Sequence, residues 1–303
     1  MISLKQLRYF DAVARVSHFG KAAEQCAVTQ PALSMQIQEL EKFLGVQLIE
    51  RSRSGAMLTE AGREVAGRAA RVLTELRDIV DYARRQGGLT GPLHFGVIPS
   101  IAPYVLPALL PVVRDTYPDL ELHLRETQTQ HLLDELVDGH LDLLLLALPV
   151  EHAEVETTRL FTDRFLLAMP KSRRIANRVR ATPELLQQDR LLLLEEGHCL
   201  RDQALAFCEL RRVDNIDTFG ASNLSTIVQM VANGLGLTLL PELAVDLEVR
   251  RGDIRLMRFI DPQPRRTIGL AWRKSSPRKR PFAELGKLIT QATAAQMQLS
   301  EAV

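Results

Sequence analysis

The chain has 303 residues, of which 46% are hydrophobic and 25% are charged, and its formal net charge is +1. This composition is that of an ordinary globular protein with room for two or three domains, and the near-zero charge points to no class of partner. Residues 1–90 carry 13 Lys and Arg against 10 Asp and Glu, whereas the remainder carries 25 against 27. This asymmetry has the sign expected if the N-terminal part contacts DNA.

Two features of the sequence bear on its location. The N-terminus lacks a basic stretch followed by a long apolar one, so we expect no signal peptide. The most apolar run, 141–150, is too short to cross a bilayer and suits a buried strand. We therefore expect a cytoplasmic protein with no membrane partner.

Its three cysteines, Cys26, Cys199 and Cys208, are too few for a structural disulfide framework in that compartment.

Residues 1–58 are predicted to form three short helices and then a hairpin. In the first helix, apolar residues at 4, 7, 10 and 14 share one face, a second helix fits 20–27, and a third fits 30–44 and ends at Gly45. Two short apolar pieces within 46–58 flank the turn 51–55, which indicates a two-stranded wing.

The start of the third helix carries residues suited to DNA. Thr29 can cap this helix, and Pro31 is tolerated in the first turn because the N–H groups there have no helical partner. Apolar positions 33 and 37 face the core, which leaves Gln30, Ser34 and Gln36 outward. A helix-turn-helix presents this part of its second helix to the major groove, where Gln reads adenine and Ser contacts bases or phosphates.

The predicted wing carries two arginines, Arg51 and Arg53. They would contact phosphates or the minor groove, with a solvated loop as the alternative.

One long helix is predicted over 59–88. Thr59 can cap it, and Glu60 lies at its positive end. Apolar residues then recur at alternating steps of four and three: Val65, Ala69, Val72, Leu76, Ile79 and Ala83. This heptad pattern favours a dimerising two-helix coil over a helix packed on its own domain. A glycine-rich stretch ending at Pro92 marks a domain boundary.

Strand and helix signals alternate over 89–303. Strands are predicted at 93–98, 120–125, 141–148, 165–169, 191–195, 235–240 and 266–272, with helices between them that include 102–117 and 130–138. This alternation predicts an α/β fold with mainly parallel sheets. The length suffices for two lobes with a cleft between them, which we place at about 89–162 with 268–303 (lobe I) and about 163–267 (lobe II).

The stretch 22–37, continued by 40–45, 48–51 and 58–62, resembles the helix-turn-helix of LysR-type regulators. Met35 departs from the pattern, because many members carry Arg there. The resemblance implies an all-α winged helix-turn-helix domain (1–58), a dimerising linker helix (59–88) and a regulatory domain (89–303). The last is an α/β effector domain of two Rossmann-like lobes that resembles periplasmic solute-binding proteins. Implied partners are double-stranded promoter DNA, RNA polymerase and further copies of the chain, as a homodimer or homotetramer.

The second informative segment is 195–208. Because it follows an apolar strand, Cys199 is expected at a helix start, near free N–H groups, with His198 and Arg201 beside it. These features favour the thiolate, which attacks peroxide to give a sulfenic acid that a second thiol converts to a disulfide. If 200–208 is helical, nine residues span about 13 Å, whereas a disulfide needs Cα atoms about 5–6 Å apart. Bond formation would then require the segment to refold.

From spacing alone, Cys199 and Cys208 could equally be small buried hydrophobic residues, which is the commoner fate of cysteine. We interpret Cys26, in the second helix, as part of the core. No histidine joins carboxylates or cysteines at a zinc-like spacing, and no P-loop or nucleophile elbow is present. We therefore expect no metal, no cofactor and no enzymatic activity.

Segment 197–204 followed by Phe207-Cys208 resembles the redox segment of the hydrogen-peroxide sensors of the LysR family, as do 97–99, 103–104, 128–129, 239–241 and 264–270. The resemblance implies that Cys199 is the peroxidatic cysteine and Cys208 the resolving one, reset by a thiol reductant system. It places these residues around the peroxide pocket: Ser100, Thr129, His198, Arg201, Asp202 and Arg266. Ser100 replaces a frequent Thr and keeps its hydroxyl, and Asp202 is expected to anchor the reduced loop. Residues 209–213 depart from the pattern.

The leading hypothesis is a transcription factor that senses hydrogen peroxide through a reversible Cys199–Cys208 disulfide and controls oxidative-stress genes. The alternative is a LysR-type regulator that binds a small organic effector between the lobes and has inert cysteines. A thiol peroxidase is disfavoured by the DNA-binding motif. A solute-binding transport protein is disfavoured by the same motif and by the missing signal peptide.

Overall fold

The computed structural model describes residues 1–52, 55–83, 88–173, 180–182, 185–186, 189–210, 216–249 and 253–299. The chain forms two compact units, one of Met1–Gln86 with Glu135–His140 and the other of Gly87–Asp134 with Leu141–Val303. No helix of the described ranges is long and apolar enough to cross a membrane.

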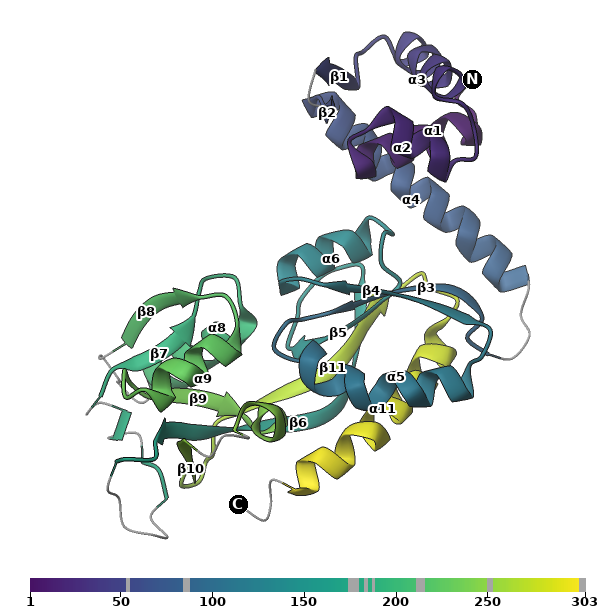
Figure 1. Cartoon of the computed structure of the whole chain (residues 1–303). Helices are drawn as coiled ribbons and strands as arrows, with labels where there is room; N and C mark the ends of the chain where they lie inside the picture. Colours follow the sequence, from purple (N-terminus) through teal and green to yellow (C-terminus); the bar gives the residue numbers. More distant parts are fainter. Residues whose placement is uncertain are drawn as a thin grey trace. The chain divides into compact units, whose positions relative to one another are not determined.

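The first unit begins with three helices, a hairpin and a long helix (Figure 1): α1 Leu4–Val16, α2 Phe19–Gln25, α3 Gln30–Leu44, β1 Ile49–Ser52, β2 Gly55–Leu58 and α4 Glu60–Ala83. The predicted bounds of α3 are confirmed, and Gly45 ends it in the left-handed region with φ 70°. Helix α2 lies earlier than 20–27 because His18 caps it. The His18 Nδ1 accepts hydrogen bonds from the N–H groups of Gly20 and Lys21 at 3.1 and 3.3 Å.

Close packing fixes the start of α4 to the hairpin. The Thr59 hydroxyl accepts a hydrogen bond from the Gly62 N–H at 2.9 Å, which confirms the predicted cap, and donates to the Gln47 carbonyl at 2.8 Å. A Cβ atom at Gly62 would lie 2.0 Å from the Leu48 carbonyl oxygen. Leu48 is fully buried in the core of the helices. Only glycine therefore allows α4 to approach the hairpin this closely.

The six heptad residues of α4 divide into two groups. Val65 and Ala69 pack against the core of the three N-terminal helices. Val72 and Ile79 are 44% and 62% exposed, Leu76 is half-buried and Ala83 is exposed. The first half of the stripe thus serves the domain's own core, whereas the second half presents apolar side chains to solvent.

The rest of the chain alternates strands and helices: β3 Gly91–Val97, α5 Ala102–Thr116, β4 Leu120–Glu126, α6 Thr129–Val137, β5 Leu143–Leu148, β6 Val155–Pro170, β7 Leu191–Leu194, α8 Cys199–Leu210, β8 Ile216–Ala221, α9 Leu224–Ala232, β9 Thr238–Pro241, η1 Glu242–Ala244, α10 Val245–Glu248, β10 Ile254–Arg258, β11 Arg265–Arg273 and α11 Lys279–Leu299. The predicted strands are all found. The first half of β6, and all of β8 and β10, lie outside the predicted ranges.

The main sheet has the order β10-β6-β11-β5-β3-β4, with β9 also paired to β6, and β7 pairs with β8 separately. Parallel pairing joins β3 to β4 and β5, and β7 to β8, but β6 and β11 make antiparallel pairs throughout. The expectation of mainly parallel sheets was therefore wrong. The reason is that the chain passes between the lobes along β6 and returns along β11, and two such neighbouring strands must run in opposite directions.

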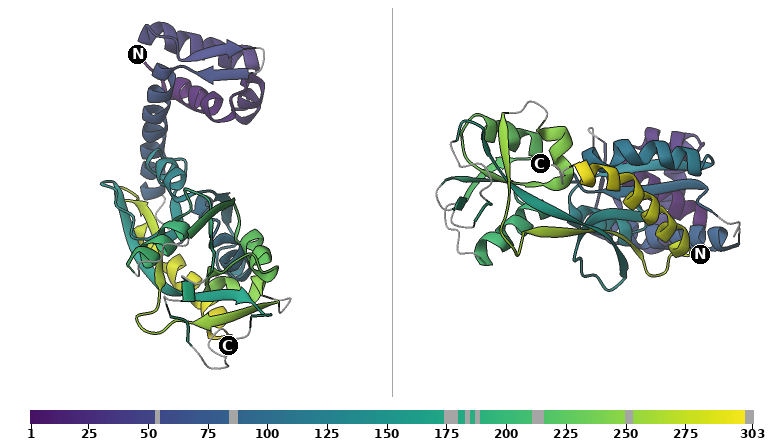
Figure 2. Two further views of the ribbon diagram at one scale, coloured as in Figure 1. Left: turned by 90° about the vertical axis from the view of Figure 1, so that its left-hand side faces the viewer. Right: turned by 90° about the horizontal axis from the view of Figure 1, so that it is seen from below.

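Helices cover both faces of the sheet in lobe I (Figures 1 and 2). Helix α11 packs against α5 and places Gly286 over Leu270 of β11. On the other face, Leu132 of α6 lies over Gly96 of β3, where a Cβ atom would meet its side chain at 2.8 Å. This is the two-lobed α/β architecture of periplasmic-binding-protein type that the sequence predicts.

The contact at Gly62 yields a test of the N-terminal fold. We expect Gly62→Ala to lower the free energy of unfolding of this unit by roughly 1–3 kcal/mol, because the new methyl group overlaps the Leu48 carbonyl. Urea unfolding of the full-length protein, followed by circular dichroism, measures this. Gly67→Ala on the same helix is the control. Its Cβ would have only an ordinary 3.5 Å contact, so stability should stay constant or rise by about 0.5–1 kcal/mol. Equal effects of the two substitutions would contradict the packing described.

Candidate DNA interface and redox site

Helix α3 turns one face to the core and another to solvent. Leu33 and Ile37 are at most 1% exposed. The predicted contact residues are exposed or half-buried: Thr29, Gln30, Pro31, Ser34 and Gln36. Met35 is 54% exposed beside them. The N-terminal end of α3 therefore offers polar side chains and one thioether on the side away from the core.

Thr29 occupies the N-cap position of α3, but its hydroxyl makes no capping hydrogen bond. The prediction of a side-chain cap was wrong. An N-cap side chain accepts from the second or third N–H of the helix, and Pro31 at the second position removes one of these two donors. Gln36 donates to the Glu39 carboxylate at 2.9 Å. Gln30 is thus the exposed amide at the start of the helix.

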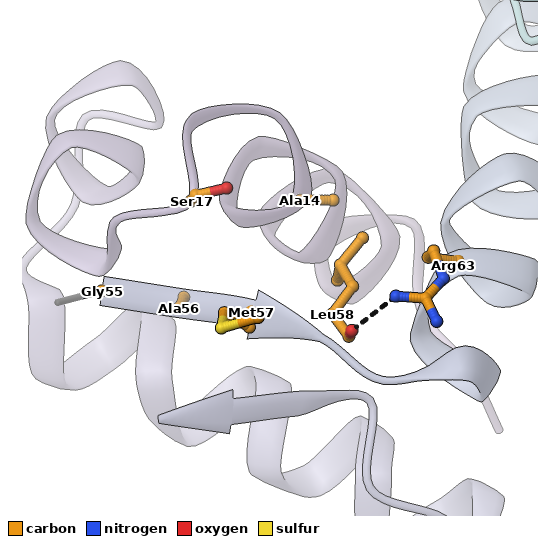
Figure 3. A pocket seen from close by; sticks show the side chains of 7 residues that line it. All are labelled: Ala14, Ser17, Gly55, Ala56, Met57, Leu58 and Arg63. Carbon is orange, nitrogen blue, oxygen red and sulfur yellow. Dashed lines mark hydrogen bonds between the residues drawn. The ribbon is translucent and has the colours of Figure 1, made fainter. Parts of the chain in front are cut away.

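The root of the wing is anchored to the helices. The Ala56 N–H donates to the Ser17 carbonyl at 2.9 Å, and the Arg63 guanidinium donates to the Leu58 carbonyl at 3.1 Å. These residues lie along an open groove of about 360 Å³, whose lining is labelled in Figure 3: Ala14, Ser17, Gly55, Ala56, Met57, Leu58 and Arg63. The side chain of Arg51, in β1, and all of Arg53 lie outside what the structure describes.

Cys26 is half-buried against the helical core. Burial raises the pKa of its thiol, although the nearby Arg8 and Arg15 act in the opposite direction. A raised pKa disfavours the reactive thiolate, which agrees with the interpretation of Cys26 as a core residue.

A buried arginine ties the lobes together in the effector domain. Arg266 of β11 is 2% exposed, and its Nε donates to Asp163 of β6 at 2.8 Å. Its Nη1 and Nη2 donate to the Ser100 hydroxyl and carbonyl at 2.8 and 2.9 Å. The second Asp163 oxygen accepts from the Leu243 N–H at 3.1 Å. Two predicted pocket residues, Ser100 and Arg266, are therefore in direct contact.

A second contact brings the start of α6 to the loop before α8. Gln128 lies against Gly197, where a Cβ atom would be 2.5 Å from the Gln128 side-chain oxygen, and it donates weakly to the Glu196 carbonyl at 3.4 Å. Gly197 has φ 88°, in the left-handed region. Thr129, the next residue, has a buried hydroxyl with no hydrogen-bond partner among the described residues. This hydroxyl is suited to a small polar molecule, since buried polar groups are nearly always paired.

The predicted redox residues His198 and Cys199 come directly after Gly197 in the chain. Cys199 is the first residue of α8 and is half-buried, and His198 is 7% exposed. The His198 Nε2 lies 3.9 Å from Glu195, and the Arg201 guanidinium lies 3.7 Å from Glu196. Asp202 is exposed in the first turn of α8 and has no side-chain contact among the described residues that would anchor the loop.

Helix α8 is continuous from Cys199 to Leu210, so both cysteines of the predicted pair stand on one helix. Nine residues of helix separate their Cα atoms by about 13 Å along the axis, against about 5–6 Å in a disulfide. The side chain of Cys208 lies outside the described part. In this helical state the two cysteines cannot be bonded.

Several residues of the site have no role assigned from the sequence, although Tyr104 and Gln128 lie in segments that carry the family resemblance. Asp163 and Gln128 hold the two contacts described above. A third contact between the lobes joins Tyr104 of α5 to Glu248 of α10 at 2.9 Å, and Ser225 also donates to Glu248, at 2.8 Å. Burial is the main cause that raises the pKa of the Tyr104 phenol, and the nearby Glu248 carboxylate raises it further. The phenol therefore keeps its proton and donates a hydrogen bond to Glu248. The signal for Asp163 was a lone carboxylate just before the apolar run 165–169.

No group of three or more His, Cys, Asp or Glu side chains within the described ranges could hold a metal ion.

Comparison with known proteins identifies the family. Residues 4–63 match the bacterial regulatory helix-turn-helix protein model of the lysR family, and residues 86–294 match the LysR substrate binding domain. The chain is 42% identical over 289 residues to the DNA-binding transcriptional dual regulator OxyR of Escherichia coli, covering 95% of each chain. It is 45% identical over 293 residues to a probable hydrogen peroxide-inducible genes activator of Streptomyces viridosporus, covering 96% of this chain and 94% of the relative.

Solved structures of OxyR proteins are similar to this chain in fold as well as in sequence. A full-length OxyR variant from Pseudomonas aeruginosa superposes with a TM-score of 0.84 at 39% identity, with 95% of each chain covered. The chain therefore belongs to the LysR family of bacterial helix-turn-helix regulators and, within it, resembles the hydrogen-peroxide-inducible activators of the OxyR type.

Proposed function

We propose that this chain is a cytoplasmic transcription factor that senses hydrogen peroxide by a reversible disulfide between Cys199 and Cys208 and controls oxidative-stress genes. The observation that carries the proposal is the placement of both cysteines on helix α8, with Cys199 at its start beside the buried His198. The similarity to OxyR proteins over 95% of the chain supports the same function.

The chemistry needs no cofactor. The Cys199 thiolate attacks one oxygen of hydrogen peroxide, the O–O bond breaks, and the products are a sulfenic acid and hydroxide. The Cys208 thiol then displaces the sulfenic oxygen as water, and a disulfide forms. A thiol reductant system returns two electrons and two protons and restores both thiols. Peroxide is used once per switching event, so the protein acts as a sensor rather than an enzyme.

The peroxide pocket draws on residues from both lobes. The unpaired Thr129 hydroxyl and the hydroxyl of Ser100 can each donate to and accept from a small peroxide molecule. Arg266 positions Ser100 through two hydrogen bonds. His198 and Arg201 flank Cys199 in the chain, and the negative charge of the exposed Asp202 is favourable in the first turn of α8, at the positive end of the helix.

Oxidation must refold α8, because the helix holds the cysteines too far apart for a bond. The loop at Gly197 would move with it and release its contact with Gln128 at the start of α6. A segment with two incompatible arrangements is the bistable element that a switch requires. The change would reach promoter DNA and RNA polymerase through the spacing of the DNA-binding domains.

In this proposal, residues 1–58 bind DNA, residues 59–88 form the dimer and residues 89–303 regulate. The regulatory part consists of lobe I, at about 89–162 with 268–303, and lobe II, at about 163–267. The exposed apolar residues Val72 and Ile79 support a homodimer formed through α4, which pairs further into a homotetramer.

Thiol counting by mass spectrometry on intact protein tests the sensor. After brief stoichiometric hydrogen peroxide, the wild type should lose two thiols and yield a linked Cys199–Cys208 peptide. Cys199→Ser should lose none, and Cys208→Ser should stop at a trappable sulfenic acid on Cys199. Cys26→Ser is the control and should behave as the wild type. Thiols that stay free in the wild type would favour the alternative, a regulator of a small organic effector.

The DNA interface is tested at Gln30. We expect Gln30→Ala to weaken binding to an operator duplex by roughly 1–3 kcal/mol, because an amide that reads adenine is lost. Fluorescence anisotropy at fixed salt measures the affinity. Gln38→Ala is the matched control, an exposed glutamine on the C-terminal half of the same helix, and should bind within twofold of the wild type. Equal losses would exclude Gln30 as a base-reading residue.

The linker helix is tested by charge insertion. Ile79→Asp should shift the protein from dimer or tetramer to monomer in analytical ultracentrifugation, because it buries a carboxylate in the predicted seam. Val80 stands one position off the seam and is 44% exposed, against 62% for Ile79, and Val80→Asp should have a much smaller effect. An unchanged assembly for Ile79→Asp would rule out the heptad seam as the dimer interface.

A further inference from the structure

The two faces of the crossing strands β6 and β11 differ in charge, because one carries a buried ion pair and the other carries arginines. Side chains alternate along a strand, so Asp163 and Arg266 point inward as a buried pair, whereas their neighbours Arg164 and Arg265 point outward. Arg164 is half-buried and Arg265 is exposed. The register places these two arginines directly opposite each other, with Cβ atoms about 4.5–5.5 Å apart as in any such pair.

A third arginine extends the cluster. The Arg159 guanidinium lies 3.5 Å from the hydroxyl of Thr267. Thr267 is the next outward residue after Arg265 along β11 and stands opposite Thr162. Arg159, Arg164, Arg265 and the two threonine hydroxyls therefore share one outer face, which we call the hinge arginine cluster.

The hinge arginine cluster lacks an internal counter-charge. Among the described residues, none of its three guanidinium groups forms an ion pair with a carboxylate. Like charges directly opposite on neighbouring strands destabilise the pairing. An anion between the two guanidinium groups would reverse this effect, because each can donate two parallel hydrogen bonds to an oxyanion.

We infer that the hinge arginine cluster binds a small, doubly charged oxyanion of the phosphate class. Arg164 and Arg265 clamp the anion, and Arg159 with the threonine hydroxyls completes its donors. The anion ties β6 to β11 on the face opposite the contact of Arg266 with Asp163. The site is separate from the proposed redox chemistry, so each can fail without the other.

Isothermal titration calorimetry of the full-length protein with inorganic phosphate tests the site, with chloride at matched ionic strength as the blank. The wild type should give saturable heat, and the double variant Arg164→Gln with Arg265→Gln should lose at least tenfold in affinity. Arg280→Gln is the control, since Arg280 is an exposed arginine paired with Glu284, and should bind as the wild type.

Thermal unfolding gives a second readout. In chloride, removing the like charges should leave the midpoint of the double variant equal to or above that of the wild type, which also shows that the variant folds. Added phosphate should raise the midpoint of the wild type and of Arg280→Gln but not that of the double variant. The inference would be overturned if phosphate gave the same binding heat or the same rise of the unfolding midpoint in the double variant as in the wild type. It would also be overturned if the effects of phosphate were no larger than those of chloride.

Discussion

The effector domain is organised around one buried guanidinium. Arg266 reaches Asp163 on the neighbouring crossing strand and both oxygens of Ser100 in the loop after β3, while Asp163 accepts from the Leu243 N–H. An ion pair this deeply buried is held only when its remaining donors and acceptors are satisfied, and breaking it costs about 3–5 kcal/mol. The contact thus fixes three segments at once, and the proposed peroxide pocket inherits its geometry from them.

The second constraint is the length of helix α8. In the helix, Cys199 and Cys208 lie about two and a half turns apart, at a distance that no disulfide spans, so the helical state itself prevents the bond. Oxidation and refolding are therefore a single event in the proposed mechanism. The Gly197 backbone, packed on Gln128, links that event to α6. Gly197 has φ 88°, and a Cβ atom there would lie 2.5 Å from the Gln128 side-chain oxygen, so only glycine fits this contact.

Local signals made much of the fold predictable. The bounds of α3 follow from Pro31 near its start and Gly45 at its end, and the cap of α4 follows from Thr59. The first half of β6 was missed because its partly exposed side chains form no apolar run. The direction of β6 and β11 depends on pairing between residues about a hundred positions apart. Likewise Asp163, Gln128 and Glu248 act through distant partners, which a reading of neighbouring residues does not reveal.

Amide hydrogen exchange across α8 tests the central claim most directly. Peptides from 199–210 would be compared in reduced protein and in protein oxidised with stoichiometric peroxide, with Cys199→Ser as the control. The proposed mechanism predicts slow exchange in the reduced helix, much faster exchange after oxidation, and no change in the variant. A Cys199–Cys208 bond formed while the helix amides keep their protection would contradict it.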